Sequence, residues 1–219
     1  MVAKAPVPGQ VKTRLTPGLT PVQAAEVARA LLADTLANAD RVHGDRWWVH
    51  AGCTAEVARS VPPGVALLEQ VGETFAQRLA AAQAALFSRG YDRVVLLGAD
   101  CPTVGPRDLR RALGALEAAD VVLGPARDGG YTLLGACAPA AGLFLGVPMG
   151  TGSVLSATLE RARALDLSVA LTPQRHDLDT LEDLRAASAA GELDGAPVTS
   201  ALLAALGVTT RRAGCDPRA

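Results

Sequence analysis

DRVVLLGADCP, residues 92–102, joins a continuous apolar run to an acidic residue at its end. An apolar run without polar alternation is typical of a strand that is buried on both faces of a parallel sheet. Asp100 follows this run, at the end of the strand where such sheets bind their ligands. Alternatively, Asp100 only caps a turn, because its carboxylate could accept a backbone N–H. We favour the functional role from the position of Asp100.

Strand-like and helix-like segments alternate on both sides of this stretch. Thr20 and Pro21 form a good helix start, an N-cap followed by proline at the first helical position. The patterns predict strands at 46–52, 65–70, 92–100, 121–126, 131–136 and 168–172, a short helix after the first of these strands, and longer helices at 22–39, 73–89, 105–118, 152–165, 180–190 and 198–206. This alternation predicts an α/β fold, a three-layer, doubly wound, mostly parallel sheet. We expect residues 1–206 to form a single domain and 207–219 to form a poorly ordered tail.

Composition limits the class of protein. The net charge is −1 and 20% of the 219 residues are charged, so no global field favours nucleic acid or an acidic membrane. No apolar run approaches the ~20 residues of a membrane span, and no signal peptide is recognisable, so we expect a cytoplasmic protein. Cys53, Cys101, Cys137 and Cys215 contain no C-x-x-C pair, which argues against a zinc site or a disulfide framework. We expect buried free thiols.

The segment APVPGQVKTRL, residues 5–15, is a basic loop that includes Lys12 and Arg14 and follows Lys4. A Walker loop needs glycine immediately before the lysine, and Val11 stands there, so we reject the ordinary P-loop. The simpler interpretation is a solvated loop. The functional interpretation is another kind of phosphate-binding loop. Because three residues precede Lys4, a strand leading into this loop is expected to be very short, or the chain starts further upstream.

The segment HDLDTLEDL carries two further acidic candidates, Asp177 and Asp179. Positions two apart in an extended segment project to the same side, so these carboxylates can share a cation. Oxygen ligands without histidine or cysteine suit Mg²⁺ or Mn²⁺ and argue against zinc. The alternative is that Asp179 caps the following helix while Asp177 is solvated. His176 is expected to be structural, because neighbouring residues on a strand point in opposite directions.

Two glycine-containing segments could contact a ligand through their backbones. Asp128-Gly129-Gly130 links two predicted strands, and Asp-Gly is a strong hairpin signal, while paired glycines also allow close approach of a ligand. Gly150-Thr151-Gly152-Ser153 precedes a predicted helix, where free N–H groups and two hydroxyls form a natural anion site. An ordinary N-cap by Thr151 or Ser153 is the alternative.

Four of these motifs together resemble a known family. AKAPVPGQVKTRL, LLGADCP, DVVLGPARDGGYTLLG and HDLDTLEDL, in this order over residues 3 to about 190, are similar to the bacterial DUF2064 family of GT-A-fold proteins, which is usually labelled as uncharacterised glycosyltransferases. The same order resembles, more distantly, the 2-phospho-lactate guanylyltransferases and other nucleotidyltransferases. The resemblance implies the GT-A, or nucleotide-diphospho-sugar transferase, type of fold.

The resemblance also implies roles for individual residues. The metal, Mg²⁺ or Mn²⁺, would be held by Asp100, Asp177 and Asp179. Lys12 and Arg14 would face the nucleotide phosphates and, with Asp100, form the catalytic set. The nucleotide-binding loop would comprise Lys4, Pro8, Gly9, Lys12 and Arg14, and the acceptor would face Asp128, Gly129, Gly130, Thr151, Gly152 and Ser153. The partners are then a nucleoside triphosphate or nucleotide sugar and a small acceptor.

Three functions are compatible with these residues. The first is a Mg²⁺-dependent nucleotidyltransferase, in which a phosphorylated or carboxylated acceptor attacks an NTP and releases pyrophosphate. The basic loop favours it, because a triphosphate carries the charge that Lys12 and Arg14 would match. The alternatives are a glycosyltransferase that uses a nucleotide-diphosphate sugar, and a non-catalytic nucleotide-binding module.

Overall fold

The computed structural model describes residues 1–209, in which every predicted helix and strand is present. The strands are β1 (Val2–Lys4), β2 (Arg46–Ala51), β3 (Val65–Glu69), β4 (Val94–Leu97), β5 (Val121–Pro125), β6 (Tyr131–Ala136) and β7 (Val169–Leu171). The helices are α1 (Pro21–Asp40), α2 (Thr54–Ser60), α3 (Phe75–Phe87), α4 (Pro106–Ala115), α5 (Val154–Ala164), α6 (Leu181–Ala189) and α7 (Pro197–Ala205), with 3₁₀ turns η1 (Thr13–Leu15) and η2 (Ala141–Phe144) that the sequence analysis did not predict.

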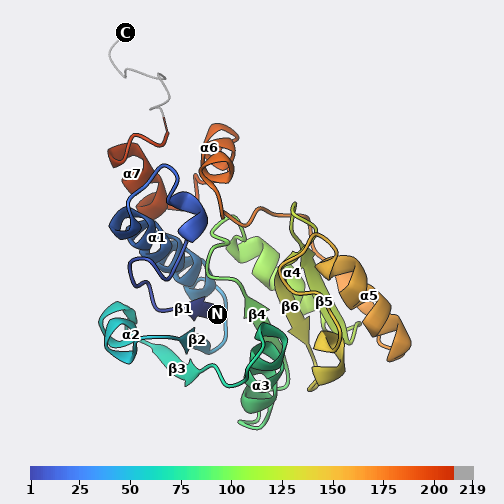
Figure 1. The fold of residues 1–219 in the computed structure, drawn as a ribbon. Coiled ribbons are helices and arrows are strands. Elements are labelled where there is room, and N and C mark those ends of the chain that lie inside the picture. Colours follow the sequence, from blue (N-terminus) through green and yellow to red (C-terminus); the bar gives the residue numbers. More distant parts are fainter. Residues whose placement is uncertain (210–219) are drawn as a thin grey trace.

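The strands form two neighbouring sheets. β1, β2 and β3 are parallel, in the order β1-β2-β3, and the second sheet has the order β4-β6-β5-β7. A single parallel bridge between Val2 and Gly98 connects β1 to the end of β4. The basic loop therefore follows a short strand beside the apolar stretch 92–102, as predicted (Figure 1).

Two strand pairs in the second sheet are antiparallel. β4 pairs with β6 in the antiparallel sense, and β6 also runs antiparallel to β5. The cause is the short connection between β5 and β6, because a parallel crossover needs a dozen or more residues. The other three strand pairs are parallel, so the first sheet is parallel and the second is mixed.

Helices cover both faces of the sheet. On one face, Leu36 of α1 and Leu109 of α4 pack with Leu97 of β4 in a buried cluster. On the other face, Leu79 of α3 packs with Leu134 of β6 in a second cluster, to which α5 and η2 also contribute. The predicted three-layer α/β fold is therefore confirmed.

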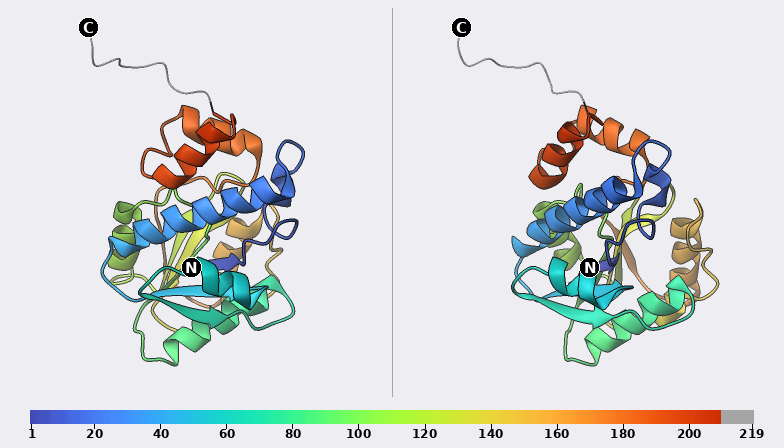
Figure 2. Two further views of the ribbon diagram at one scale, coloured as in Figure 1. Left: turned by 90° about the vertical axis from the view of Figure 1, so that its left-hand side faces the viewer. Right: turned by 60° about the vertical axis from the view of Figure 1, so that its left-hand side comes forward.

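A third apolar cluster joins the C-terminal helices to α1. Leu31 of α1, Leu184 of α6 and Leu203 of α7 are fully buried against one another. Figure 2 shows α1 lying between these helices and the rest of the molecule. Asp34 of α1 strengthens this contact, because its buried carboxylate accepts the first amides of α7, from Val198 at 3.2 Å and Thr199 at 2.7 Å.

Some details differ from the sequence analysis. Cys101 is buried as predicted, but Cys53 is exposed and Cys137 is only partly buried. Cys215 and residues 210–219 of the predicted tail lie outside the described part of the chain. Within residues 1–209, none of the helices combines the length and the apolar character that crossing a bilayer requires.

We predict that Asp34→Ala destabilises the protein by about 1–3 kcal/mol, because it leaves the first two amides of α7, one of them buried, without an acceptor. Ala196 precedes α7 at the N-cap position and has no side-chain acceptor to replace Asp34. Urea unfolding measures the loss. Glu26→Ala, an exposed change on the same helix, is the control, and equal losses in the two variants would contradict the prediction.

Candidate functional site

A cavity of about 480 Å³ opens where β1 and β4 end. Its lining includes Lys4, Lys12, Arg14, Asp100, Asp177 and Asp179. These residues come from the basic loop, from the end of β4 and from the segment after β7, which are far apart in the sequence. The fold therefore brings the predicted catalytic and metal residues to one place, at the carboxyl ends of the parallel strands, where α/β sheets bind ligands.

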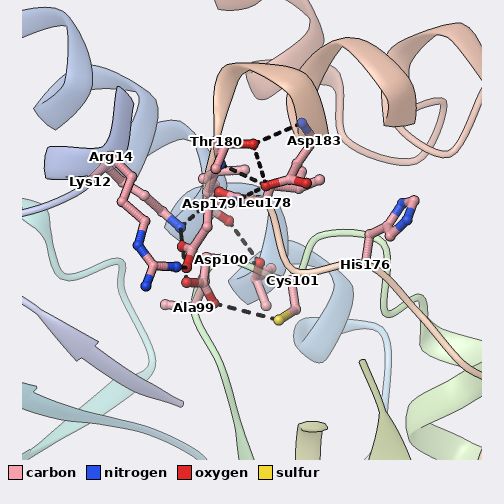
Figure 3. A network of polar contacts seen from close by, with 12 residues as sticks. Lys12, Arg14, Ala99, Asp100, Cys101, His176, Leu178, Asp179, Thr180 and Asp183 are labelled. Carbon is pink, nitrogen blue, oxygen red and sulfur yellow. Dashed lines mark hydrogen bonds and ion pairs between the residues drawn. The ribbon is translucent and has the colours of Figure 1, made fainter. Parts of the chain in front are cut away.

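Lys12 is the centre of this site. Its ammonium lies 2.9 Å from Asp100 Oδ2 and 2.5 Å from Asp179 Oδ1, and it also donates to the Leu178 carbonyl at 2.8 Å (Figure 3). Only 9% of the Lys12 side chain is exposed, so these three oxygens replace its water shell. Lys12 thus connects the basic loop to both acidic segments.

The backbone of Lys12 is strained. Its φ of 46° and ψ of 39° lie in the left-handed region, which costs a residue with a side chain roughly 1–2 kcal/mol. Such strain persists only where the surrounding structure enforces it, and it is concentrated at functional sites. Here the conformation begins η1 and turns the side chain of Lys12 inward to the carboxylates.

The charges of the site stabilise one another. Burial alone would lower the pKa of the Lys12 ammonium, but the negative charges of Asp100 and Asp179 raise it above its ordinary value. Burial would raise the pKa of the Asp100 carboxyl, but the neighbouring Lys12 ammonium lowers it below its ordinary value. Lys12 and Asp100 are therefore both charged at neutral pH.

Arg14 and Asp179 form a second, more exposed contact at 3.2 Å. The alternative that Asp179 caps the following helix is wrong. Thr180 is the N-cap of α6, and its hydroxyl and amide bond with Asp183 in a capping box (Figure 3). The Asp179 amide donates to Asp183, while its carboxylate pairs with Lys12 and Arg14.

Asp177 lines the same cavity without a cationic partner among the residues that the structure describes. Burial is the main cause that raises the pKa of its carboxyl to about 6. The negative charge of Asp128 is the next cause, ahead of Asp100 and Asp179. Four carboxylates therefore approach one another here, and one lysine neutralises only two of them directly.

The donor atoms of the site fit a hard divalent cation. Carboxylate oxygens are the ligands that Mg²⁺ and Mn²⁺ prefer, and the predicted structural role of His176 agrees with its ring, which bonds to Glu192. Within residues 1–209, no three acidic, histidine or cysteine side chains already form a group that could hold a metal ion. The Lys12 ammonium lies between Asp100 and Asp179 instead. Binding of one metal by Asp100, Asp177 and Asp179 stays a prediction.

Pro8 and Gly9 shape the basic loop without lining the cavity. The Gln10 amide donates to the Val7 carbonyl at 3.0 Å, which closes a turn around these two residues. Gly9 has a φ of +77°, the value that a type II turn needs after proline. Both are exposed, so their contact with nucleotide stays a prediction, as does that of Lys4.

The two glycine segments pack against each other beside the site. The Leu155 amide of α5 donates to the Gly129 carbonyl at 2.9 Å, and a Cβ on Gly129 would overlap the carbonyl oxygen of Gly152. Ser153 occupies the N-cap of α5 but makes no cap hydrogen bond, and its hydroxyl bonds to that of Thr151 at 2.9 Å. None of the six predicted acceptor residues lines the cavity, so their role in binding stays a prediction.

A half-buried ion pair that was not predicted from the sequence supports the site. Arg175 donates to both carboxylate oxygens of Asp108, at 2.9 and 2.8 Å, and so fixes the segment before Asp177 to α4. Thr103 Oγ1 donates to the His176 carbonyl at 2.6 Å and ties the same segment to the turn after Asp100. Neither partner is recognisable in the sequence, because 67 and 73 positions separate them.

Comparison with known proteins gives a family and three informative relatives. Residues 29–151 match the family described as "Uncharacterized protein conserved in bacteria (DUF2064)". The 2-phospho-L-lactate guanylyltransferase of Methanothermobacter thermautotrophicus is 30% identical over 123 residues, which are 56% of this chain and 55% of that enzyme. The chain thus matches about half the length of this curated relative.

Solved structures agree in fold. A Desulfovibrio desulfuricans G20 protein, provisionally described as a nucleotide-diphospho-sugar transferase, has a TM-score of 0.82 and 29% identity over 95% of this chain and 97% of its own. A Mycobacterium tuberculosis H37Rv protein, solved as a complex with manganese, has a TM-score of 0.50 and 20% identity over 83% of this chain and 92% of its own. The predicted nucleotidyltransferase-like, GT-A type of fold is therefore confirmed.

We predict that Gly129→Ala destabilises the protein by about 2–4 kcal/mol, because it combines a strained φ with overlap against Gly152. Gly150→Ala separates the two effects, since Gly150 has a φ of +82° but open space around its Cα. This control should cost only about 1–2 kcal/mol. Equal unfolding free energies for the two variants would show that the two loops do not pack tightly.

Proposed function

We propose that this chain, which belongs to the DUF2064 family of uncharacterised proteins conserved in bacteria, is a metal-dependent nucleotidyltransferase. A small phosphorylated or carboxylated acceptor attacks the α-phosphate of a nucleoside triphosphate, and pyrophosphate leaves. The observation that carries this proposal is Lys12, a buried lysine that a strained backbone holds between Asp100 and Asp179.

The reaction requires that the protein align the reactants and supply positive charge. An in-line displacement at phosphorus needs little covalent help, so a protein accelerates it by aligning the reactants and stabilising the developing charge. Lys12 and Arg14 would face the phosphates and stabilise the negative charge that develops on the leaving pyrophosphate. Asp100, Asp177 and Asp179 would hold Mg²⁺ or Mn²⁺, which when bound neutralises phosphate oxygens and aligns them.

The acceptor is proposed to bind beside the acidic segments. Asp128, Gly129 and Gly130 lie between β5 and β6, and Thr151, Gly152 and Ser153 precede α5. The hydroxyls of Thr151 and Ser153, at the start of α5 where Ser153 makes no cap hydrogen bond, suit a phosphate or carboxylate group. Lys4, Pro8 and Gly9 are proposed to belong to the nucleotide side.

The relatives support this choice. The M. thermautotrophicus relative is a guanylyltransferase by name, which makes GTP the first triphosphate to test. Manganese in the M. tuberculosis structure supports testing Mn²⁺ as an alternative to Mg²⁺. The acceptor class rests on residues 128–130 and 150–153 alone.

A glycosyltransferase with a nucleotide-diphosphate sugar is the second candidate. The D. desulfuricans relative, which matches nearly the whole chain, favours it through its description. The same carboxylates would then hold a metal on a diphosphate. The two reactions differ in their product, since nucleotidyl transfer releases pyrophosphate and glycosyl transfer releases a nucleoside diphosphate.

We expect pyrophosphate when the protein is incubated with GTP, CTP, ATP or UTP, Mg²⁺ or Mn²⁺, and a mixture of phosphorylated and carboxylated small acceptors. EDTA should abolish its release, and added Mg²⁺ should restore it. Parallel reactions with UDP-glucose and GDP-mannose are followed for nucleoside diphosphate. Release of nucleoside diphosphate without pyrophosphate would replace the proposal by the glycosyltransferase.

We also predict that Lys12→Met reduces pyrophosphate release by about 100-fold or more, because one preorganised charge is typically worth that much in such sites. Arg14→Met should also reduce pyrophosphate release, through weaker NTP binding, but by less than Lys12→Met, because Arg14 is exposed. Arg111→Met, which removes an exposed cation on α4, is the control. If Lys12→Met releases pyrophosphate at the wild-type rate, the role of the basic loop is purely structural.

A further inference from the structure

Glu192, in the connection between α6 and α7, joins two other loops through its carboxylate. Arg127, in the turn between β5 and β6, donates to Glu192 Oε1 at 3.0 Å. His176, in the segment after β7, lies with Nδ1 2.6 Å from Glu192 Oε2. An ionised carboxylate can only accept, so His176 donates this bond. Arg127 directly precedes Asp128, and His176 directly precedes Asp177.

The two loops run side by side up to this point. Ala126 and Arg175 form a parallel bridge, and the Arg175 amide donates to the Pro125 carbonyl at 2.9 Å. Gln174 Nε2 adds a bond to the Ala126 carbonyl at 3.1 Å. Beyond the bridge, the next residue of each loop bonds to Glu192. Asp128 and Asp177 are the next residues of these two loops, and the negative charge of Asp128 acts on the Asp177 carboxyl.

The negative charges of Asp128 and Asp177 repel each other when no cation is bound. Within residues 1–209, neither Asp128 nor Asp177 forms an ion pair, whereas Asp100 and Asp179 share Lys12. The Asp128 carboxylate has a backbone partner in the Gly130 amide, at 2.8 Å. Like charges that approach each other in a partly buried site push their loops apart. Bonds outside the acidic group must therefore hold the two loops together.

Glu192 is itself fixed and can hold them. Its amide donates to the Ala187 carbonyl at 2.9 Å, at the end of α6, and Leu193 beside it is buried. Only 9% of the His176 side chain and 28% of the Glu192 side chain are exposed, so solvent screens their bond weakly. The contact with Arg127 is the more exposed of the two.

We infer that Glu192 is a positioning residue, which holds Asp128 and Asp177 next to each other as carboxylates for the divalent cation of the proposed reaction. This inference rests on the proposed function. It adds Asp128 to the carboxylates that are proposed to bind the cation. Partners that orient metal ligands typically contribute about 10- to 100-fold in metal affinity. Glu192 touches neither acid and acts only through Arg127 and His176.

The test measures Mn²⁺ binding to the full chain by electron paramagnetic resonance of free Mn²⁺, well below the unfolding temperature. Glu192→Ala should weaken Mn²⁺ binding about tenfold or more, and increase amide hydrogen exchange in residues 126–130 and 175–179. Glu192→Gln keeps one carbonyl acceptor and should lie between Glu192→Ala and the wild type. Asp194→Asn, an exposed change two residues away, is the matched control and should bind Mn²⁺ like the wild type.

A merely structural role would give a different pattern. If Glu192→Ala lowers the free energy of unfolding but its folded form binds Mn²⁺ with wild-type affinity, the inference is overturned and the proposed function stands. If the wild type itself binds no Mn²⁺ and releases no pyrophosphate, the proposed function fails as well. Weaker Mn²⁺ binding in Glu192→Ala, with partial recovery in Glu192→Gln, supports the inference.

Discussion

The bridge from Lys12 to Asp100 and Asp179 is the interaction on which the site depends. It joins three segments that are separated by 88 and 167 positions in the sequence. Removing one partner of a buried charge pair leaves the other without compensation, which is costly. One ammonium group therefore connects the basic loop to both acidic segments and balances the charges of Asp100 and Asp179.

The same bridge explains why the strained backbone of Lys12 is tolerated. A left-handed lysine in an isolated loop would relax, but three oxygen acceptors hold the ammonium and α1 packs behind the loop. Leu15 of η1 is fully buried among residues of α1, α6 and α7, which anchors the loop three residues further on. The C-terminal helices thus contribute to the site although none of their side chains lines the cavity.

Two groups of carboxylates lie in or beside the cavity, and they differ in what balances their charge. Asp100 and Asp179 pair with Lys12. Asp128 and Asp177 lie on two loops that are connected through the bonds of Arg127 and His176 to Glu192. A bound divalent cation would relieve the repulsion that this arrangement maintains. Preorganised charges of this kind are what phosphoryl and nucleotidyl transfer require, since little reorganisation is then needed during the reaction.

The sequence by itself determined the order and nature of the helices and strands, because hydrophobic periodicity, caps and turn residues are local signals. It also indicated Lys12 in a basic loop and Asp100, Asp177 and Asp179 after strands as candidate site residues, because polar residues after strands lie at the ligand face of an α/β sheet. Only the tertiary structure decided that β6 lies between β4 and β5 and pairs antiparallel with β4, and that Lys12 pairs with two of the acids. The partners Asp108, Arg175 and Glu192 were likewise invisible, since long-range charge pairs leave no spacing pattern along the chain.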